Sequence, residues 1–210
     1  MAGNLLSCDK NTDRIYTHSG ISVTTTAYFS SPSTEPSGIV YDGTDLTSCD
    51  YNQGRIYLHS GITSTVTDNF FSPSSAPTGL AFDGTNLISC GISPDRIYVH
   101  SGKTSTIIDS FSTPGEDLRG LCCDGSNLLS ASDSSNRIYL HSGITSTITN
   151  SFASPSTHPS GLTYDGSNLV SCDEGTDKIY VHSGITATIT DSFATPSWDP
   201  TGLSFEEDGC

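Results

Sequence analysis

The chain has 210 residues, of which 33% are apolar, and its 23 acidic and 8 basic side chains give a net charge of −15. A surface this acidic repels phosphate backbones and anionic lipid, so nucleic acid is not an expected partner and membrane insertion is not expected. The first ten residues lack the basic start and the continuous apolar core of a secretory signal peptide, and no apolar run reaches membrane-spanning length.

One short stretch, RIYLHSG at residues 55–61, returns four more times with small changes. The copies start at residues 14, 55, 96, 137 and 178, which sets a period of 41 residues. A fixed period of this length is typical of a propeller, a solenoid or an array. Helical periodicity is absent. The units begin near residues 2, 43, 84, 125 and 166. We therefore expect one domain over residues 1–206, followed by a short tail at 207–210.

The second unit illustrates the strands expected in each repeat. Short strands are predicted at residues 46–49, 55–59, 64–71 and 79–82. Asp83-Gly84 and Ser60-Gly61 supply the turn chemistry between them. Four strands in about 40 residues make one blade of a β-propeller. The sequence thus predicts an all-β, five-bladed β-propeller with four antiparallel strands in each blade.

The innermost strand of each blade is predicted from the segments GIVY, GLAF, GLCC, GLTY and GLSF. The third residue of each segment is small, as a tapering centre requires; these residues are Val40, Ala81, Cys122, Thr163 and Ser204. The chain begins at a second strand, near residues 5–8, and ends at an innermost strand, near 202–205. We expect the final strand to complete the first blade and close the ring, which leaves no open sheet edge.

The segment PTGLAFDGTNLISC at residues 77–90, followed by DRIYV, resembles the repeat of NHL-type propellers. In that family Pro-x-Gly opens the inner strand, Asp-Gly turns to the second strand, and a basic residue followed by Ile starts the third. The resemblance covers the whole chain and implies the blade without implying any chemistry. Two features depart from it, namely five units in place of the common six and the HSG turn. Five blades are similar to the tachylectin type of lectin in number alone, and no sugar-binding motif is shared.

Cysteine accounts for seven residues, and four of them occupy one repeat position where the remaining unit has Ala131. Exchange with Ala predicts small buried residues, and equivalent positions in different blades lie too far apart for a disulfide; these residues are Cys8, Cys49, Cys90 and Cys172. Cys122, Cys123 and Cys210 fall outside this pattern. An odd total leaves at least one free thiol or an intermolecular link, and Cys210 is the one expected to be exposed.

Two repeated polar sets are candidates for metal binding. The five histidines lie on the third strand from the axis, about 10 Å outside the innermost strand given a strand spacing of about 4.8 Å, so they cannot converge on one ion; they are His18, His59, His100, His141 and His182. A hydrogen-bonded histidine at a strand end is the favoured interpretation. Five carboxylates at the ends of the innermost strands could hold a cation such as calcium; they are Asp42, Asp83, Asp124, Asp165 and Glu206. Asp before Gly also favours a tight turn, which is the preferred interpretation.

Catalytic motifs are missing, because no nucleophile elbow, phosphate loop or zinc-type cluster occurs, and nearly every Ser, His and Asp has equivalents in other units. We therefore predict a protein that is not an enzyme, with no catalytic residues, no metal site and no cofactor. A hydrolase-type enzyme at the axial mouth remains a less favoured alternative.

Comparison of the units shows where the sequence varies. The turns after the innermost and third strands hardly change, whereas the loops after the second strand (10–13, 51–54, 92–95, 133–136, 174–177) and those before each innermost strand change freely. In an up-and-down blade these two loop sets emerge on one face, which we call the variable face; the opposite side is the uniform face. Aromatic and Arg residues are common anchors of recognition surfaces. The predicted ligand-binding residues are Lys10, Tyr51, Asn52, Gln53, Glu116, Asp117, Arg119, His158, Trp198 and Asp199. Unselected drift in tolerant loops is the alternative interpretation.

The leading hypothesis is a recognition module whose variable face binds a glycan or a protein partner. The Ser/Thr-rich, Lys-poor composition favours an extracellular or virion surface. The alternative is a structural or assembly repeat protein, natural or engineered, without a ligand of its own.

Overall fold

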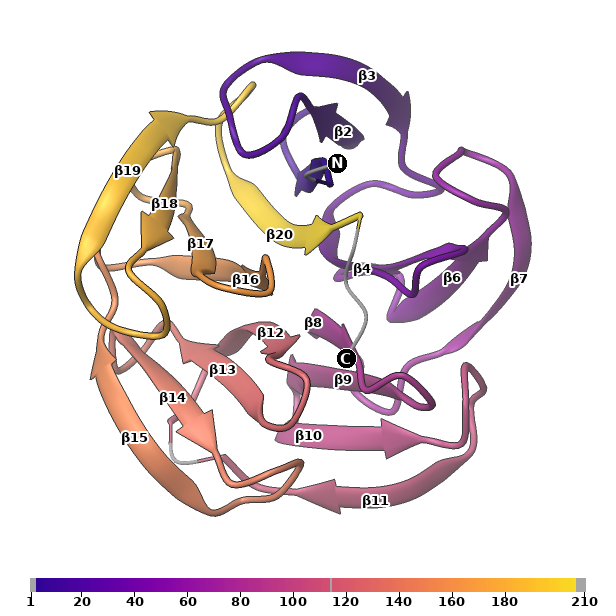
Figure 1. Ribbon diagram of the computed structural model, residues 1–210. Coiled ribbons are helices and arrows are strands. Elements are labelled where there is room, and N and C mark those ends of the chain that lie inside the picture. The colour runs from indigo at the N-terminus through magenta and orange to yellow at the C-terminus, as the bar shows by residue number, and fades with distance from the viewer. Residues whose placement is uncertain (1–2, 114, 207–210) are drawn as a thin grey trace.

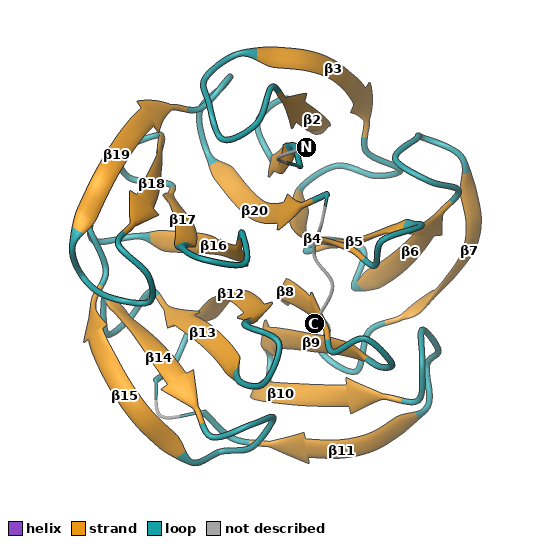
Figure 2. Ribbon diagram, in the orientation of Figure 1, coloured by secondary structure: helices purple, strands orange, loops and turns teal. Residues whose placement is uncertain are grey.

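The computed structural model describes residues 3–113 and 115–206, and in these residues the chain forms twenty strands and no helix. The strands make five antiparallel sheets of four strands each. Figure 1 shows the sheets as blades around one axis, and Figure 2 shows that loops alone connect the strands. None of the described residues forms a helix that could cross a membrane. The predicted all-β, five-bladed β-propeller is confirmed.

Blades 2 to 5 each take four consecutive strands from the innermost to the outermost, whereas blade 1 has the order β20-β1-β2-β3. The bounds are β1 (Leu5–Asp9), β2 (Arg14–His18), β3 (Thr25–Ser30), β4 (Pro36–Tyr41), β5 (Leu46–Asp50), β6 (Arg55–His59), β7 (Val66–Phe71), β8 (Pro77–Phe82), β9 (Leu87–Ile92), β10 (Asp95–His100), β11 (Ile107–Phe111), β12 (Leu118–Cys123), β13 (Leu128–Ser132), β14 (Arg137–His141), β15 (Ile148–Ala153), β16 (Pro159–Tyr164), β17 (Leu169–Asp173), β18 (Lys178–His182), β19 (Ile189–Ala194) and β20 (Pro200–Phe205).

The core lies between neighbouring blades. Strands β1, β5, β13 and β17 are buried along their whole length, because both faces of each are covered by other blades. One apolar cluster joins Val40, Cys49 and Ile56 of blade 2 to Leu80 and Leu87 of blade 3. Four similar clusters fill the other junctions. The outermost strands are largely exposed, so stability comes from contacts between blades as much as from pairing within them.

The ring closes as the sequence predicts. Strand β20 pairs antiparallel with β1, with Leu6 opposite Ser204. The hydroxyl of Ser204 also accepts a 2.8 Å hydrogen bond from the backbone N–H of Tyr41 in blade 2. The last strand therefore completes the sheet of blade 1 and connects it to blade 2.

The strand ends differ slightly from the predicted ones. The innermost strand of blade 3 begins at Pro77 rather than at residue 79, with a β-bulge between Pro77 and Gly79. The outermost strand of blade 2 begins at Val66 rather than at residue 64. Its preceding turn is longer than predicted because the backbone of Ser60 donates to Thr65 O at 2.9 Å and Thr63 Oγ1 donates to Ser60 O at 2.8 Å.

Glycines of the innermost strands set how closely the blades approach. A Cβ on Gly79 would lie 2.6 Å from the carbonyl oxygen of Arg119 and 3.1 Å from the backbone nitrogen of Leu121 in the next blade. We expect Gly79→Ala to lower the free energy of unfolding by about 1–3 kcal/mol, because both neighbours are backbone atoms that move only with their strand. Urea unfolding measures the change. Gly38→Ala, whose nearest contacts would be 3.0 Å, should cost less. A Gly79→Ala protein as stable as the parent would contradict this close approach.

Candidate functional site

A repeated backbone hydrogen bond joins the two variable loops of each blade. In every blade a residue at the end of the second strand donates its N–H to the carbonyl of the residue before the innermost strand. The pairs are Lys10 with Asp199 (3.3 Å), Tyr51 with Glu35 (3.2 Å), Ile92 with Ala76 (3.2 Å), Asp133 with Asp117 (3.0 Å) and Glu174 with His158 (3.0 Å). These bonds hold the two variable loops of each blade side by side.

A cavity of about 260 Å³ opens on the variable face at the axis, and we call it the variable mouth. Its lining comes from four blades and consists of Lys10, Glu35, Pro36, Ser37, Tyr51, Arg119, Glu174 and Thr201. Three of the predicted binding residues, Lys10, Tyr51 and Arg119, meet here. Lys10 Nζ lies 2.9 Å from Glu174 Oε2, which links blades 1 and 5 across the mouth.

The other predicted binding residues surround the mouth without lining it. Asn52, Gln53, Glu116, His158 and Trp198 are exposed, and Trp198 is 71% exposed. Asp117 and Asp199 are half-buried, and their backbone carbonyls accept the loop hydrogen bonds described above.

Asp133 connects two of the predicted residues. Its Oδ1 lies 3.0 Å from Nδ1 of His158, and its Oδ2 lies 3.6 Å from Nη2 of Arg119. Asp133 was absent from the predicted set, as were Glu35, Glu174 and Thr201. Asp133, Glu35 and Glu174 lie in variable loops, so repeat comparison could have found them. The prediction included the carboxylates Glu116, Asp117 and Asp199 but missed these three.

A ring of hydroxyls beneath the mouth joins each innermost strand to the next. Ser37 donates to Pro77 O at 2.7 Å, Thr78 to Leu118 O at 2.5 Å, Ser160 to Pro200 O at 2.5 Å and Thr201 to Pro36 O at 2.5 Å. The same hydroxyls contact the buried thiols of Cys49, Cys90, Cys172 and Cys8 at 3.2–3.4 Å. In blade 4 both partners change, because Arg119 replaces the hydroxyl residue and Ala131 replaces the cysteine.

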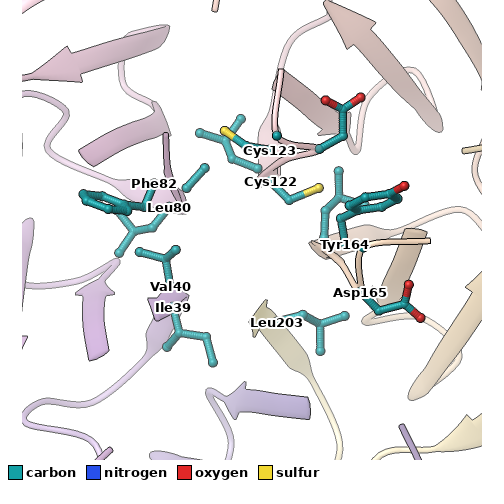
Figure 3. Close-up of a pocket in the computed structure, with 15 residues that line it drawn as sticks. Ile39, Val40, Leu80, Phe82, Cys122, Cys123, Tyr164, Asp165 and Leu203 are labelled. Atoms are coloured by element: carbon teal, nitrogen blue, oxygen red, sulfur yellow. The ribbon is translucent and has the colours of Figure 1, made fainter. Parts of the chain in front are cut away.

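The uniform face carries a second axial cavity, of about 300 Å³. Figure 3 shows Ile39, Leu80 and Leu203 around its opening, together with Tyr164 and Asp165 at its rim. The small residues predicted to fill the axis also reach it, as Val40, Ala81 and Cys122 do. The larger aliphatic residue before each of them lines the cavity as well.

The carboxylates at this end of the blades cap turns. Asp42 Oδ1 accepts the backbone N–H of Thr44 at 2.9 Å and of Asp45 at 2.7 Å, and Asp83, Asp124 and Asp165 repeat the arrangement. Glu206 instead accepts the side-chain N–H of Asn4 at 2.7 Å. The hydrogen bonds of the four aspartates are those that the turn interpretation predicts. Within residues 3–113 and 115–206 no group of three or more His, Cys, Asp or Glu side chains is placed to hold a metal ion.

Two residues on the uniform face depart from the repeat and form an ion pair with each other. Asp45 stands where the other units have Asn, and Lys103 stands where they have Ile. Lys103 Nζ contacts the carboxylates of both Asp42 and Asp45 across the junction of blades 2 and 3. Burial alone would raise the pKa of Asp42, but the N–H groups of Asp45 and Thr44 and the Lys103 ammonium hold that pKa below its usual value. The pair replaces apolar packing that Ile supplies at the other junctions.

The five repeated histidines are buried and hydrogen-bonded. His18 Nδ1 donates to Ser22 O at 2.8 Å, so its Nε2 accepts from the hydroxyl of Ser7 at 2.9 Å. The other four repeat this pairing, with Ser48, Ser89, Ser130 and Ser171. Each ring packs against a Phe of the preceding blade. The strand-end interpretation is confirmed. Although a Ser–His pair at this distance can act as nucleophile and base, a substrate cannot reach side chains that are 0–2% exposed.

The repeated cysteines are equally inaccessible. Cys8, Cys49, Cys90 and Cys172 are buried free thiols, as predicted. Burial raises the pKa of Cys8 and of Cys90 to about 12, so both thiols are neutral at physiological pH. The prediction for Cys210 lies outside the described residues.

Comparison with known proteins supports the fold and goes no further. No protein-family profile matches the sequence, and no curated protein is similar to it. Among solved structures, a chain of a nidogen/laminin complex superposes with a TM-score of 0.69 at 15% identity, covering 99% of this chain and 99% of that one. The glutaminyl cyclase of Myxococcus xanthus gives 0.64 at 14% identity, over 80% of this chain and 69% of that one. The WD40 β-propeller domain of Doa1 gives 0.60 at 14% identity, over 93% and 66%. These likenesses show a β-propeller fold, and the NHL-type resemblance stays a prediction.

Proposed function

We propose that this propeller is a recognition module whose variable face binds a protein partner. The observation that carries the proposal is the variable mouth, where Lys10, Tyr51 and Arg119 line one cavity. Each of them is a residue type that no other unit has at the equivalent position. A rigid ring that presents diversified loops on one face is the usual design of a binding surface. Propellers of this fold occur in a nidogen/laminin complex and in a mitotic checkpoint complex, so the fold is used in protein assemblies.

The residue types of the face suit a partner protein. Trp198 and Tyr51 offer aromatic anchors with few rotatable bonds, and Arg119 offers a planar group with several donors. Trp198 precedes Asp199, whose carbonyl is bonded to the backbone of Lys10, so the backbone of its loop is joined to the loop that carries Lys10. We infer also that the blades derive from an NHL-type repeat, which explains the scaffold and leaves recognition to the loops.

The test replaces the two aromatic anchors. The double variant Tyr51→Ala, Trp198→Ala should lose at least tenfold in affinity for any protein captured by the parent chain, because two anchors of about 1–2 kcal/mol each are removed. Biolayer interferometry with the captured protein measures the change. Tyr28→Ala is the matched control, since Tyr28 is an exposed aromatic residue, 58% exposed, on the outer strand β3.

Three outcomes would contradict the proposal. A captured protein that binds the double variant as tightly as the parent places recognition elsewhere. Signal on a glycan array that is lost in the double variant, with no protein captured, would favour the glycan alternative. Silence of the parent chain in both assays would favour the structural or assembly alternative, which the near-identity of the blades supports.

A further inference from the structure

Arg119 has hydrogen-bonding capacity that the fold leaves unused. Its Nε is buried and makes no hydrogen bond, and among the described residues the nearest carboxylate oxygen, Asp133 Oδ2, is 3.6 Å from Nη2. That distance allows an ion pair but exceeds the range of a good hydrogen bond. By contrast, Arg137 on the third strand of the same blade donates to the carbonyl and hydroxyl oxygens of Ser151 at 3.0 and 2.8 Å. An unsatisfied buried donor costs about 1–3 kcal/mol, so its presence calls for an explanation.

The repeat shows that the site is a departure from a stable alternative. The other four blades place a Ser or Thr at this position, where its hydroxyl bonds both the next blade and a cysteine thiol. In blade 4 both residues of that pair have changed, to Arg119 and Ala131, and the hydroxyl that bridged two blades is gone. The substitution gives up a satisfied contact and places a guanidinium in the wall of the variable mouth.

The charges of the mouth permit an anionic group there. Its charged lining consists of Lys10 and Arg119 against Glu35 and Glu174, which sum to zero, so the net charge of −15 is not concentrated at this opening. Glu174 is paired with Lys10 at 2.9 Å. Lys10 thus has a close carboxylate partner, whereas Arg119 has only the longer ion pair with Asp133, at 3.6 Å.

We propose that the variable mouth is a carboxylate-binding site in which the Arg119 guanidinium receives an acidic side chain, Asp or Glu, of the partner protein. A carboxylate matches the planar fork of a guanidinium with two parallel hydrogen bonds, which neutral acceptors cannot do as strongly. The cavity of about 260 Å³ is large enough for one such side chain. This proposal rests on the proposed function, because it assigns the chemistry of the partner at the same face.

The experiment needs no identified partner. The parent chain is titrated with N-acetyl-glutamate N-methylamide and, in parallel, with its uncharged isostere N-acetyl-glutamine N-methylamide. The readout is the arginine Nε–H signal in nitrogen-15 NMR, and the chain has only five arginines to resolve. We expect the glutamate probe to shift the Arg119 signal and to bind about tenfold more tightly than the glutamine probe, because a charge-assisted pair is roughly twice as strong as a neutral one.

A consensus-restoring variant is the matched control. Arg119→Ser with Ala131→Cys rebuilds the hydroxyl–thiol pair that four blades already contain, so it should fold at least as well as the parent and lose the glutamate response. Equal binding of both probes, or an unmoved Arg119 signal, overturns the carboxylate site.

The experiments also separate the two proposals. Partner binding that depends on Tyr51 and Trp198 but survives Arg119→Ser/Ala131→Cys removes this inference and leaves the proposed function intact. A shifted Arg119 signal in a chain that captures no protein would keep the carboxylate site and remove the proposed protein-binding function. A tight complex with an acidic glycan in place of a protein overturns the assignment of the partner.

Discussion

A chain that ends at Asp199 is expected not to fold into a ring. The truncation removes β20, which pairs along the whole of β1, a strand with all five residues buried. It also removes Leu203 and Phe205 from the cluster between blades 5 and 1. Burial of each of those side chains contributes about 1.5–3 kcal/mol, and the lost ladder adds to this. The total is comparable with the entire stability of a domain, about 5–15 kcal/mol.

Far-UV circular dichroism and urea unfolding of residues 1–199 measure the effect, and a chain ending at Glu206 is the control because it keeps β20 itself. A synthetic peptide of residues 200–206 added to the truncated chain should restore the cooperative transition, since it can re-form the missing strand. A truncated chain that unfolds cooperatively at the urea concentration of the control would show that closure by β20 contributes little.

The closure itself could be predicted from the sequence because the repeat is out of phase with the chain. The first unit begins at a second strand and the last segment has the pattern of an innermost strand, so only one pairing leaves no open edge. The number of blades and the order of strands follow from the 41-residue period in the same way. These properties are local and repeated, and each copy confirms the others.

The lining of the variable mouth could not be predicted in full. Whether Lys10 reaches Glu174 depends on how blades 1 and 5 face each other, which no spacing within one repeat reveals. Trp198, chosen for its uniqueness, lies outside the cavity, whereas Glu35 lies within it. The rarity of a residue type within the repeat could not give the direction of its side chain.

The residues that depart from the repeat in pairs could be predicted only in part. Ser37 and Cys49 are twelve residues apart, as are Arg119 and Ala131, so the repeat alone shows that both changed in one blade. Only the contact of Ser37 with Cys49, 3.3 Å, shows why they changed together. Asp45 and Lys103 lie in different blades, and their connection becomes visible only when the junction is seen.

The buried histidines are expected to make stability depend steeply on pH. Burial lowers the pKa of His18, His59, His100, His141 and His182 below the ordinary value of 6.5, although a backbone carbonyl at each ring opposes the shift. In the unfolded chain these rings regain ordinary values. Between pH 6.5 and the lowered folded-state pKa, the unfolded state therefore binds protons that the folded state does not.

The sign follows from that difference. Because the unfolded state binds more protons, the free energy of unfolding falls as the pH falls below about 6.5, and the loss continues until the folded-state histidines also protonate. Five rings acting together set an upper limit of about 7 kcal/mol per pH unit, at about 1.4 kcal/mol each. Asp9, Asp50 and Asp95 act in the opposite direction, since burial raises the pKa of each above 3.8.

Urea unfolding at pH 7.5, 6.5 and 5.5 tests this prediction, and the transition midpoint should fall at each step, with the larger fall between 6.5 and 5.5. Proton uptake on unfolding, measured by calorimetry in buffers of different ionisation enthalpy, should rise as the pH falls below about 6.5. His141→Gln removes one titrating ring and should reduce that uptake whatever its effect on stability, whereas Ser130→Ala, which removes only the hydroxyl partner, should leave the number of titrating rings unchanged. A midpoint that stays constant or rises between pH 7.5 and 5.5 would show that the folded ring accommodates charged histidines, and the repeated Ser–His pairs would then be tolerant of protonation instead of dependent on neutrality.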